Sequence, residues 1–365
     1  MRGLEWIHKF IDDEETFDDI GMDGFYIYHE LSLTSENHAV RRRAKALAIE
    51  YARRIHDKLN KKTEFDAHDS IKAWDLLAEV NLLGLAAEPL LSKARRSLPL
   101  LNAEGKIFGI HRTPLKDADD ARLYDILMDA YAIEKAAAIF PNEAWPKFGL
   151  SQVLHFIRNK KELRSSASDG FEDDAFLATH VAYVLTNYGR LRLHADSSVV
   201  STLRGDSSVV STLRGDSPVV STLRGDSSVV STIRGDSPEV STLRGDSSVV
   251  STLRGESSEW ITNYLRKHFH AVLKNKDIEL VAEFIDVFRS LGQDERTDPM
   301  IRQGTEFLLR TQHSDGSWGD WRSAESYYDA MHFTWCAVMG LRRRSFMKGT
   351  PYEKRIRGVF AALKR

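Results

Sequence analysis

Cysteine is almost absent from this 365-residue chain, in which Cys336 is the only one. A single cysteine excludes an internal disulfide framework and a zinc site built from several cysteines. A chain without disulfides is typical of a reducing compartment, so we expect a cytoplasmic protein.

Long apolar runs and a charge of one sign are also lacking. The first residues, MRGLEWIHKFIDDEETFDD, contain no apolar run that fits a signal peptide. No stretch approaches the roughly 20 apolar residues that a membrane helix needs. The net charge is −2 with both signs well mixed, which argues against nucleic acid or an acidic membrane as the partner. The sequence leaves the oligomeric state open.

Apolar residues recur every three to four positions, as in amphipathic helices. The clearest examples are the stretches 38–59, 70–94 and 119–140, where Pro89 and Pro141 are expected to act as breaks. Further helices are expected at 148–162, 172–190, 258–274, 276–292, 299–312, 325–343 and 351–363. No convincing alternating strand stands outside the central repeats. We therefore predict an all-α fold of about ten helices.

Six copies of a decapeptide, D-S-S-V-V-S-T-L-R-G, occupy residues 196–255 with few changes. A glycine in every unit and four Ser/Thr positions disfavour a continuous helix. The segment is either a small strand-turn array or a flexible loop with too few apolar residues to form a core, and we favour the loop. It interrupts the helical pattern, so the predicted parts are 1–195, the repeats 196–255, and 256–365.

The segment 306–343 contains the pattern Gln-x-x-Asp-Gly-Ser-Trp, as Gln312, Asp315, Gly316, Ser317 and Trp318. Glycine permits a tight turn there, and the Asp and Ser side chains can bond exposed backbone amides. This pattern resembles the helix-end motif of the α/α-toroid families, the squalene-hopene cyclases and the protein prenyltransferase β-subunits. The resemblance covers about forty residues and implies an α/α toroid, here a partial barrel interrupted by the repeats.

In prenyltransferase β-subunits a Tyr-His pair near this position supplies a zinc ligand. Tyr327, Tyr328 and His332 stand nearby in this chain, with Cys336 one helical turn further on the same face. The Asp-x-Cys ligand pair of that family is missing, because no other cysteine exists. The zinc site implied by the resemblance therefore does not carry over intact.

Three histidines lie in similar apolar, aromatic surroundings: His29, His180 and His332. In a toroid they can point into one central cavity, where three neutral imidazoles, with Glu30 or Asp329, suit Fe, Cu or Zn. The alternative is that each is an ordinary buried histidine with its own hydrogen bonds. His111 is a weaker fourth candidate.

Asp117, Asp119 and Asp120 match D-x-D-D, the proton-donating motif of class II terpene cyclases. We prefer the interpretation that these acids cap the helix that follows. Asp119 is a catalytic candidate only if the protein is a cyclase.

Three functions remain open. The first is a metal-dependent, oxidative enzyme that modifies peptides, with its own repeats as a substrate carried in the same chain, as in multi-core precursors of ribosomally made peptides. The second is a terpenoid cyclase or prenyl-binding enzyme with a passive insertion. The third is a non-enzymatic scaffold whose repeats bind a partner. Under the first, which we favour, the substrate positions include the following Arg and Asp residues of the repeats: Arg204, Asp206, Arg214, Asp216, Arg224, Asp226, Arg234, Asp236, Arg244 and Asp246.

Overall fold

The computed structural model describes the whole chain except residues 84, 86–87, 161–162, 193–259, 349 and 363–365. Its first half contains α1 (Arg2–Ile11), α2 (Glu14–Thr34), α3 (His38–Lys61), α4 (Ala67–Leu83), α5 (Glu88–Ser97), α6 (Asp120–Ile139), α7 (Leu150–Lys160) and α8 (Phe171–Thr186). A helix at 260–275 follows, then α13 (Ile278–Ser290), α14 (Pro299–Thr311), α15 (Tyr327–Leu341) and α16 (Pro351–Ala362). Two short 3₁₀ helices, η1 (Leu98–Asn102) and η2 (Leu115–Asp117), lie between α5 and α6. The repeats lie outside the described residues.

The all-α prediction is confirmed for the described residues, in which only two isolated β-bridges occur. The expected break within the stretch 70–94 lies before Pro89, because α4 ends at Leu83 and α5 begins at Glu88. Pro89 is the second residue of α5, a position in the first turn that tolerates proline. The sequence analysis did not identify α1 and α2, which fill the first 34 residues. No described helix combines the length and the apolar composition needed to cross a bilayer.

Side-chain caps fix the starts of several helices. An oxygen of the N-cap side chain accepts backbone N–H groups of the first turn, which satisfies donors that have no partner inside the helix. The caps for α2, α3, α6, α13, α14 and α15 are Asp13, Asn37, Asp119, Asp277, Asp298 and Ser326.

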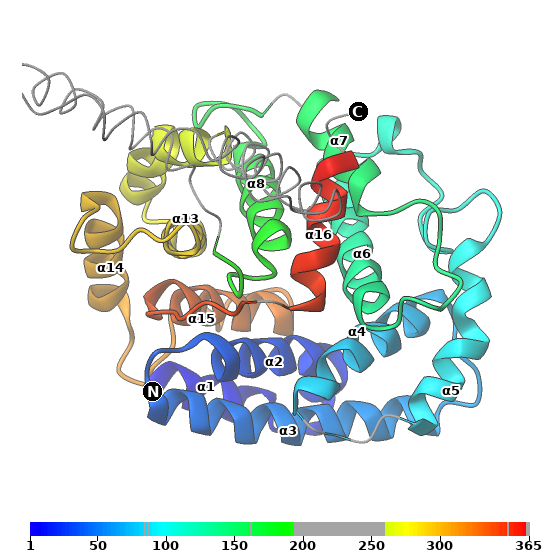
Figure 1. Cartoon of the computed structure of the whole chain (residues 1–365). Coiled ribbons are helices and arrows are strands. Elements are labelled where there is room, and N and C mark those ends of the chain that lie inside the picture. The colour runs from blue at the N-terminus through cyan, green and yellow to red at the C-terminus, as the bar shows by residue number, and fades with distance from the viewer. Residues whose placement is uncertain (84, 86–87, 161–162, 193–259, 349, 363–365) are drawn as a thin grey trace, which may run out of the picture.

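Among the helices that the structure describes, every second one lines one central cavity. Counting the helix at 260–275, the lining helices are α2, α4, α6, α8, α13 and α15. Contacts join them in the order α2–α15–α13–α8–α6–α4. The helices between them cover the outside; Figure 1 shows α1 and α3 beside α2. The apolar core therefore surrounds the cavity.

The Gln-x-x-Asp-Gly-Ser-Trp segment forms the turn between α14 and α15. Asp315 Oδ1 accepts the backbone N–H of Ser317 at 3.0 Å, which confirms the expected local bond. Gly316 has φ +100°, and a Cβ there would lie 2.8 Å from the backbone of Arg2. Only glycine fits this position, where the turn packs against the start of α1.

Gln312 and Trp318 connect this turn to its neighbours by hydrogen bonds. Gln312 Nε2 donates to the carbonyl of Gly316 at 3.0 Å. Trp318 Nε1 donates to the carbonyl of Leu308 in α14 at 2.7 Å, and its backbone N–H donates to Thr334 Oγ1 in α15 at 3.0 Å. The turn thus connects α14 to the middle of α15, the helix that carries His332.

Candidate metal and catalytic site

The central cavity has a volume of about 420 Å³. Its wall is rich in tyrosine and also carries tryptophan, histidine and carboxylate side chains. The aromatic members are Tyr26, Tyr124, Tyr131, Tyr183, Tyr188, Tyr328 and Trp335. Such a mainly aromatic cavity with a few converging polar groups is the usual form of a small-molecule or side-chain binding site.

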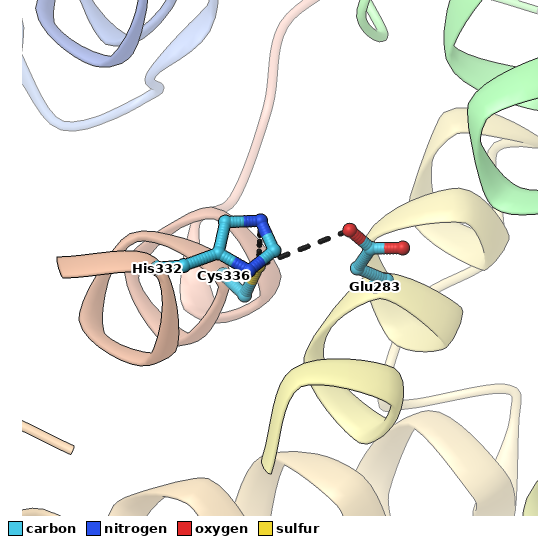
Figure 2. Close-up of side chains that lie close together, drawn as sticks. All are labelled: Glu283, His332 and Cys336. Carbon is cyan, nitrogen blue, oxygen red and sulfur yellow. Dashed lines mark hydrogen bonds between the residues drawn. The ribbon is translucent and has the colours of Figure 1, made fainter. Parts of the chain in front are cut away.

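Three metal-binding side chains converge on this cavity. Glu283 comes from α13, and His332 and Cys336 lie one turn apart on α15, as Figure 2 shows. Cys336 Sγ lies 3.4 Å from His332 Nε2 and 3.8 Å from Glu283 Oε1, and the three ligand atoms lie within 4.8 Å of one another. Ligand atoms of a tetrahedral zinc site, with bonds of about 2.0–2.3 Å, lie about 3.3–3.8 Å apart. The two measured spacings therefore suit a tetrahedral ion.

Close packing of two helices brings Glu283 to the α15 side chains. Gly340 on α15 faces the backbone of Ala282 on α13, where a Cβ would lie 2.7 Å from the carbonyl oxygen. A larger residue at 340 would push the helices apart and lengthen the distance from Glu283 to Cys336.

Two of the candidate ligands are held by partners outside the set. His332 Nδ1 lies 3.0 Å from Glu279 Oε1, so its Nε2 is directed to Cys336. The Thr179 hydroxyl donates to Glu283 Oε2, which leaves Oε1 for Cys336. A histidine ligand that gives its other ring N–H to a carboxylate is the usual outer-shell arrangement of a metal site.

Burial shifts the proton equilibria of the set. It raises the pKa of Glu283 to about 8 and raises the pKa of the Cys336 thiol. For His332, burial lowers the pKa, but the hydrogen bond to Glu279 and the nearby carboxyls outweigh it, so the pKa is raised above 6.5. At neutral pH the Glu283 carboxyl and the Cys336 thiol therefore hold protons that a bound cation would displace.

His180, on α8, lines the same cavity with 6% of its surface exposed. Its Nδ1 lies 2.8 Å from the carbonyl oxygen of Phe176. Its Nε2 lies 3.4 Å from the Tyr124 hydroxyl. Burial lowers the pKa of His180 to about 4, so the ring is neutral at pH 7.

His29 does not line the cavity. It is fully buried, its Nε2 lies 2.9 Å from Glu79, and its ring stacks on Phe25. The structure therefore brings His180 and His332 to one cavity and places His29 in a separate contact, so the three predicted imidazoles do not converge. His111 also has its own partner, Asp129, at 2.7 Å.

The acids predicted to assist the histidines have other partners. Asp329 is bonded to Ser326, the N-cap of α15. Glu30 belongs to a buried ion network of eight charged side chains on and behind the cavity wall. Its members are Glu30, Asp75, Glu79, Asp286, Lys135, Arg190, Arg342 and Arg344.

Comparisons with family models, curated proteins and solved structures give no match. The function must therefore be argued from the site itself.

Sequence reasoning missed Glu283, Glu279, Thr179 and Tyr124. Each acts through a partner on another helix, and no local pattern marks it. His332 and Cys336 carried a signal, because positions i and i+4 share one face of a helix. The repeat positions proposed as substrate lie outside the described residues.

Asp119 is the exposed N-cap of α6 and accepts the backbone N–H of Arg122 at 2.8 Å. It does not line the cavity. Asp117 lies in η2, and Asp120 pairs with Arg164. This placement favours capping over proton donation.

Asp119→Ala is therefore expected to lower the free energy of unfolding by about 0.5–2 kcal/mol, the usual effect of losing a cap. The midpoint of urea unfolding measures this loss, and Asn37→Ala at the cap of α3 is a matched control. Metal uptake is expected to stay at the wild-type level. Loss of a catalytic activity without a change in the unfolding midpoint would contradict the capping role.

Proposed function

We propose that this protein is a metal-dependent enzyme that modifies peptides, with its decapeptide repeats as substrate in the same chain. The observation that carries the proposal is the convergence of Glu283, His332 and Cys336 on one aromatic-lined cavity. Metal-ligand spacing, outer-shell bonds and an adjoining space for a substrate occur together there.

The alternation of lining and covering helices supports an α/α toroid as the architecture. The turn that carries Gln312 and Trp318 supports the same inference, because Trp318 ties the last turns of an outer helix, at Leu308, to the middle of a lining one, at Thr334. Enzymes of many kinds use such a central cavity, so the fold alone selects no reaction.

The donor set favours zinc over a redox metal. One thiolate, one imidazole and one carboxylate whose donor atoms lie within 4.8 Å of one another suit Zn²⁺ with a fourth position open. Such an ion would supply Lewis-acid polarisation of a carbonyl or activation of water. The chain's own residues would hold the ion through Glu283, His332 and Cys336 and orient the imidazole through Glu279. Zinc chemistry of this kind is hydrolysis or group transfer on the peptide, not the oxidation expected from the sequence.

The covalent connection between the cavity and the repeats supports the in-cis substrate. His180 on α8 and Arg190 just after it both line the cavity, and the first repeat begins at Asp196, six positions beyond Arg190. A substrate joined to its own site has a high effective concentration there. Six near-identical units would then receive the same modification.

Intact mass and elemental analysis of the full chain test this proposal. After expression with Zn²⁺, and separately with Fe²⁺ or Cu²⁺, we expect one metal per chain and a mass change repeated for each decapeptide. Cys336→Ser is the control, which should lack both. A chain that holds its metal and keeps an unchanged mass would refute peptide modification.

A second candidate is an isoprenoid cyclase, which the aromatic wall of the cavity favours. Because Asp119 lies outside the cavity, the acid in that case would be Glu283, which is buried and bonded to Thr179. Removal of residues 196–255 would leave isoprenoid turnover unchanged, and Glu283→Gln would abolish it.

A further inference from the structure

His180 has a fixed proton arrangement. The carbonyl oxygen of Phe176 can only accept a hydrogen bond, so the nitrogen 2.8 Å away, Nδ1, carries the ring proton. In a neutral imidazole the other nitrogen, Nε2, is then an unprotonated acceptor. The Tyr124 hydroxyl, 3.4 Å away on the cavity wall, donates towards it.

His180 is not one of the three candidate metal ligands. Among the described residues, the metal-ligating atoms that lie within 4.8 Å of one another belong to Glu283, His332 and Cys336, and His180 is not in that set. It is nevertheless adjacent to the site, because Thr179, the preceding residue, donates to Glu283. A neutral imidazole on the wall of a substrate cavity is the arrangement that general base catalysis requires.

We propose that His180 is the proton acceptor for a hydroxyl group of the peptide substrate and is not a metal ligand. This inference rests on the proposed function above. Four of the ten positions are Ser or Thr in four of the repeats, as in Ser197, Ser198, Ser201 and Thr202, and three are in the two repeats that carry Pro218 or Pro238. Hydroxyl groups are therefore the most frequent polar side chains of the proposed substrate.

The proton transfer is balanced within the site. A substrate hydroxyl replaces the Tyr124 hydroxyl at Nε2, its O–H bond breaks, and an N–H bond forms on the imidazole. The oxygen keeps the electron pair and attacks the peptide carbonyl carbon on its N-terminal side, so that an ester C–O bond forms and the C–N bond breaks. The imidazolium gives its Nε2 proton to the leaving amine nitrogen, and water then hydrolyses the ester, which adds one water mass for each cleaved unit. Nδ1–H stays bonded to the carbonyl of Phe176 throughout.

His180→Asn tests this role with little disturbance. The amide N–H of asparagine can take the place of Nδ1–H and donate to Phe176, but nothing replaces Nε2. We expect an unchanged zinc content, an unchanged absorption spectrum of the Co²⁺-substituted chain, and a rate of mass change per repeat at least about 100-fold lower. His268→Asn is the matched control, a buried histidine outside the cavity lining that contacts Ser166.

Metal content and modification rate together distinguish failure of this inference from failure of the proposed function. Loss of metal in His180→Asn, as in Cys336→Ser, would make His180 a ligand and overturn the inference. A rate of modification equal to that of wild type would also overturn it, while leaving the proposed function intact. A wild-type chain that takes up no metal, or is never modified, would instead remove the proposed function and this inference with it.

Discussion

Replacing Glu79 by alanine is expected to lower the free energy of unfolding by about 3–5 kcal/mol, because two buried cations, Lys135 and Arg190, each lose one of their two carboxylate partners. Glu79 is 1% exposed. Its carboxylate accepts hydrogen bonds from Arg190 at 2.8 and 3.0 Å. It also pairs with Lys135 Nζ at 2.7 Å and contacts His29. A loss of this size is a large share of the 5–15 kcal/mol that keeps typical proteins folded.

Urea unfolding measures this effect, with Glu79→Gln as a second variant that keeps the side-chain volume and two polar atoms. We expect Glu79→Gln to unfold at a urea concentration between those of wild type and Glu79→Ala. The control is Glu5→Ala, because Glu5 forms a partly exposed pair with Arg43, and such pairs contribute below about 1 kcal/mol. Equal effects at Glu5 and Glu79 would show that burial does not set the strength of the network.

The Glu79 carboxylate also makes the stability of the protein depend on pH, and the direction of that dependence follows from its pKa. Burial raises the pKa of Glu79, but Arg190 and Lys135 outweigh it and hold the pKa well below 4.5. A group with a lowered folded pKa stabilises the protein above its unfolded pKa. The stability that Glu79 contributes is therefore complete above about pH 4.5 and is lost as the pH falls further. Below that pH the free energy of unfolding should fall more steeply for wild type than for Glu79→Gln. Equal slopes of the two free energies against pH would contradict this.

Local patterns predicted the helices well, because each amphipathic stretch and each cap lies within one segment. The capping role of Asp119 is an example, since its bond to Arg122 spans only three residues. A break within 70–94 was expected at Pro89, but α4 ends at Leu83 and the proline is the second residue of α5, because proline is tolerated in the first turn of a helix.

The candidate site was predicted only where its residues share a helix. His332 and Cys336 are four positions apart, so the sequence placed them on one face. Glu283 lies on another helix, and its distance from them depends on the contact of Gly340 with Ala282. His29 has the same aromatic surroundings in sequence as His180, but it packs against Glu79 on α4. The residues next to a histidine in the sequence therefore do not specify which other helix its side chain will contact.

Cys336→Ser is expected to reduce zinc affinity by more than the 10–100-fold that outer-shell substitutions cost. Serine keeps the size of the side chain and removes the thiolate, the softest donor of the set and the one that favours zinc. Competition with a chromophoric chelator measures the affinity, and the Co²⁺-substituted chain should lose its thiolate-to-cobalt absorption.

Glu279→Gln is the graded control for that experiment. Its amide oxygen can still accept the Nδ1–H of His332, but the negative charge that makes the imidazole a stronger donor is gone. Zinc affinity should therefore fall within the 10–100-fold range, between wild type and Cys336→Ser. If Cys336→Ser bound zinc as tightly as wild type, the thiol would be an ordinary buried side chain and not a metal ligand, despite its distances of 3.4 Å from His332 and 3.8 Å from Glu283.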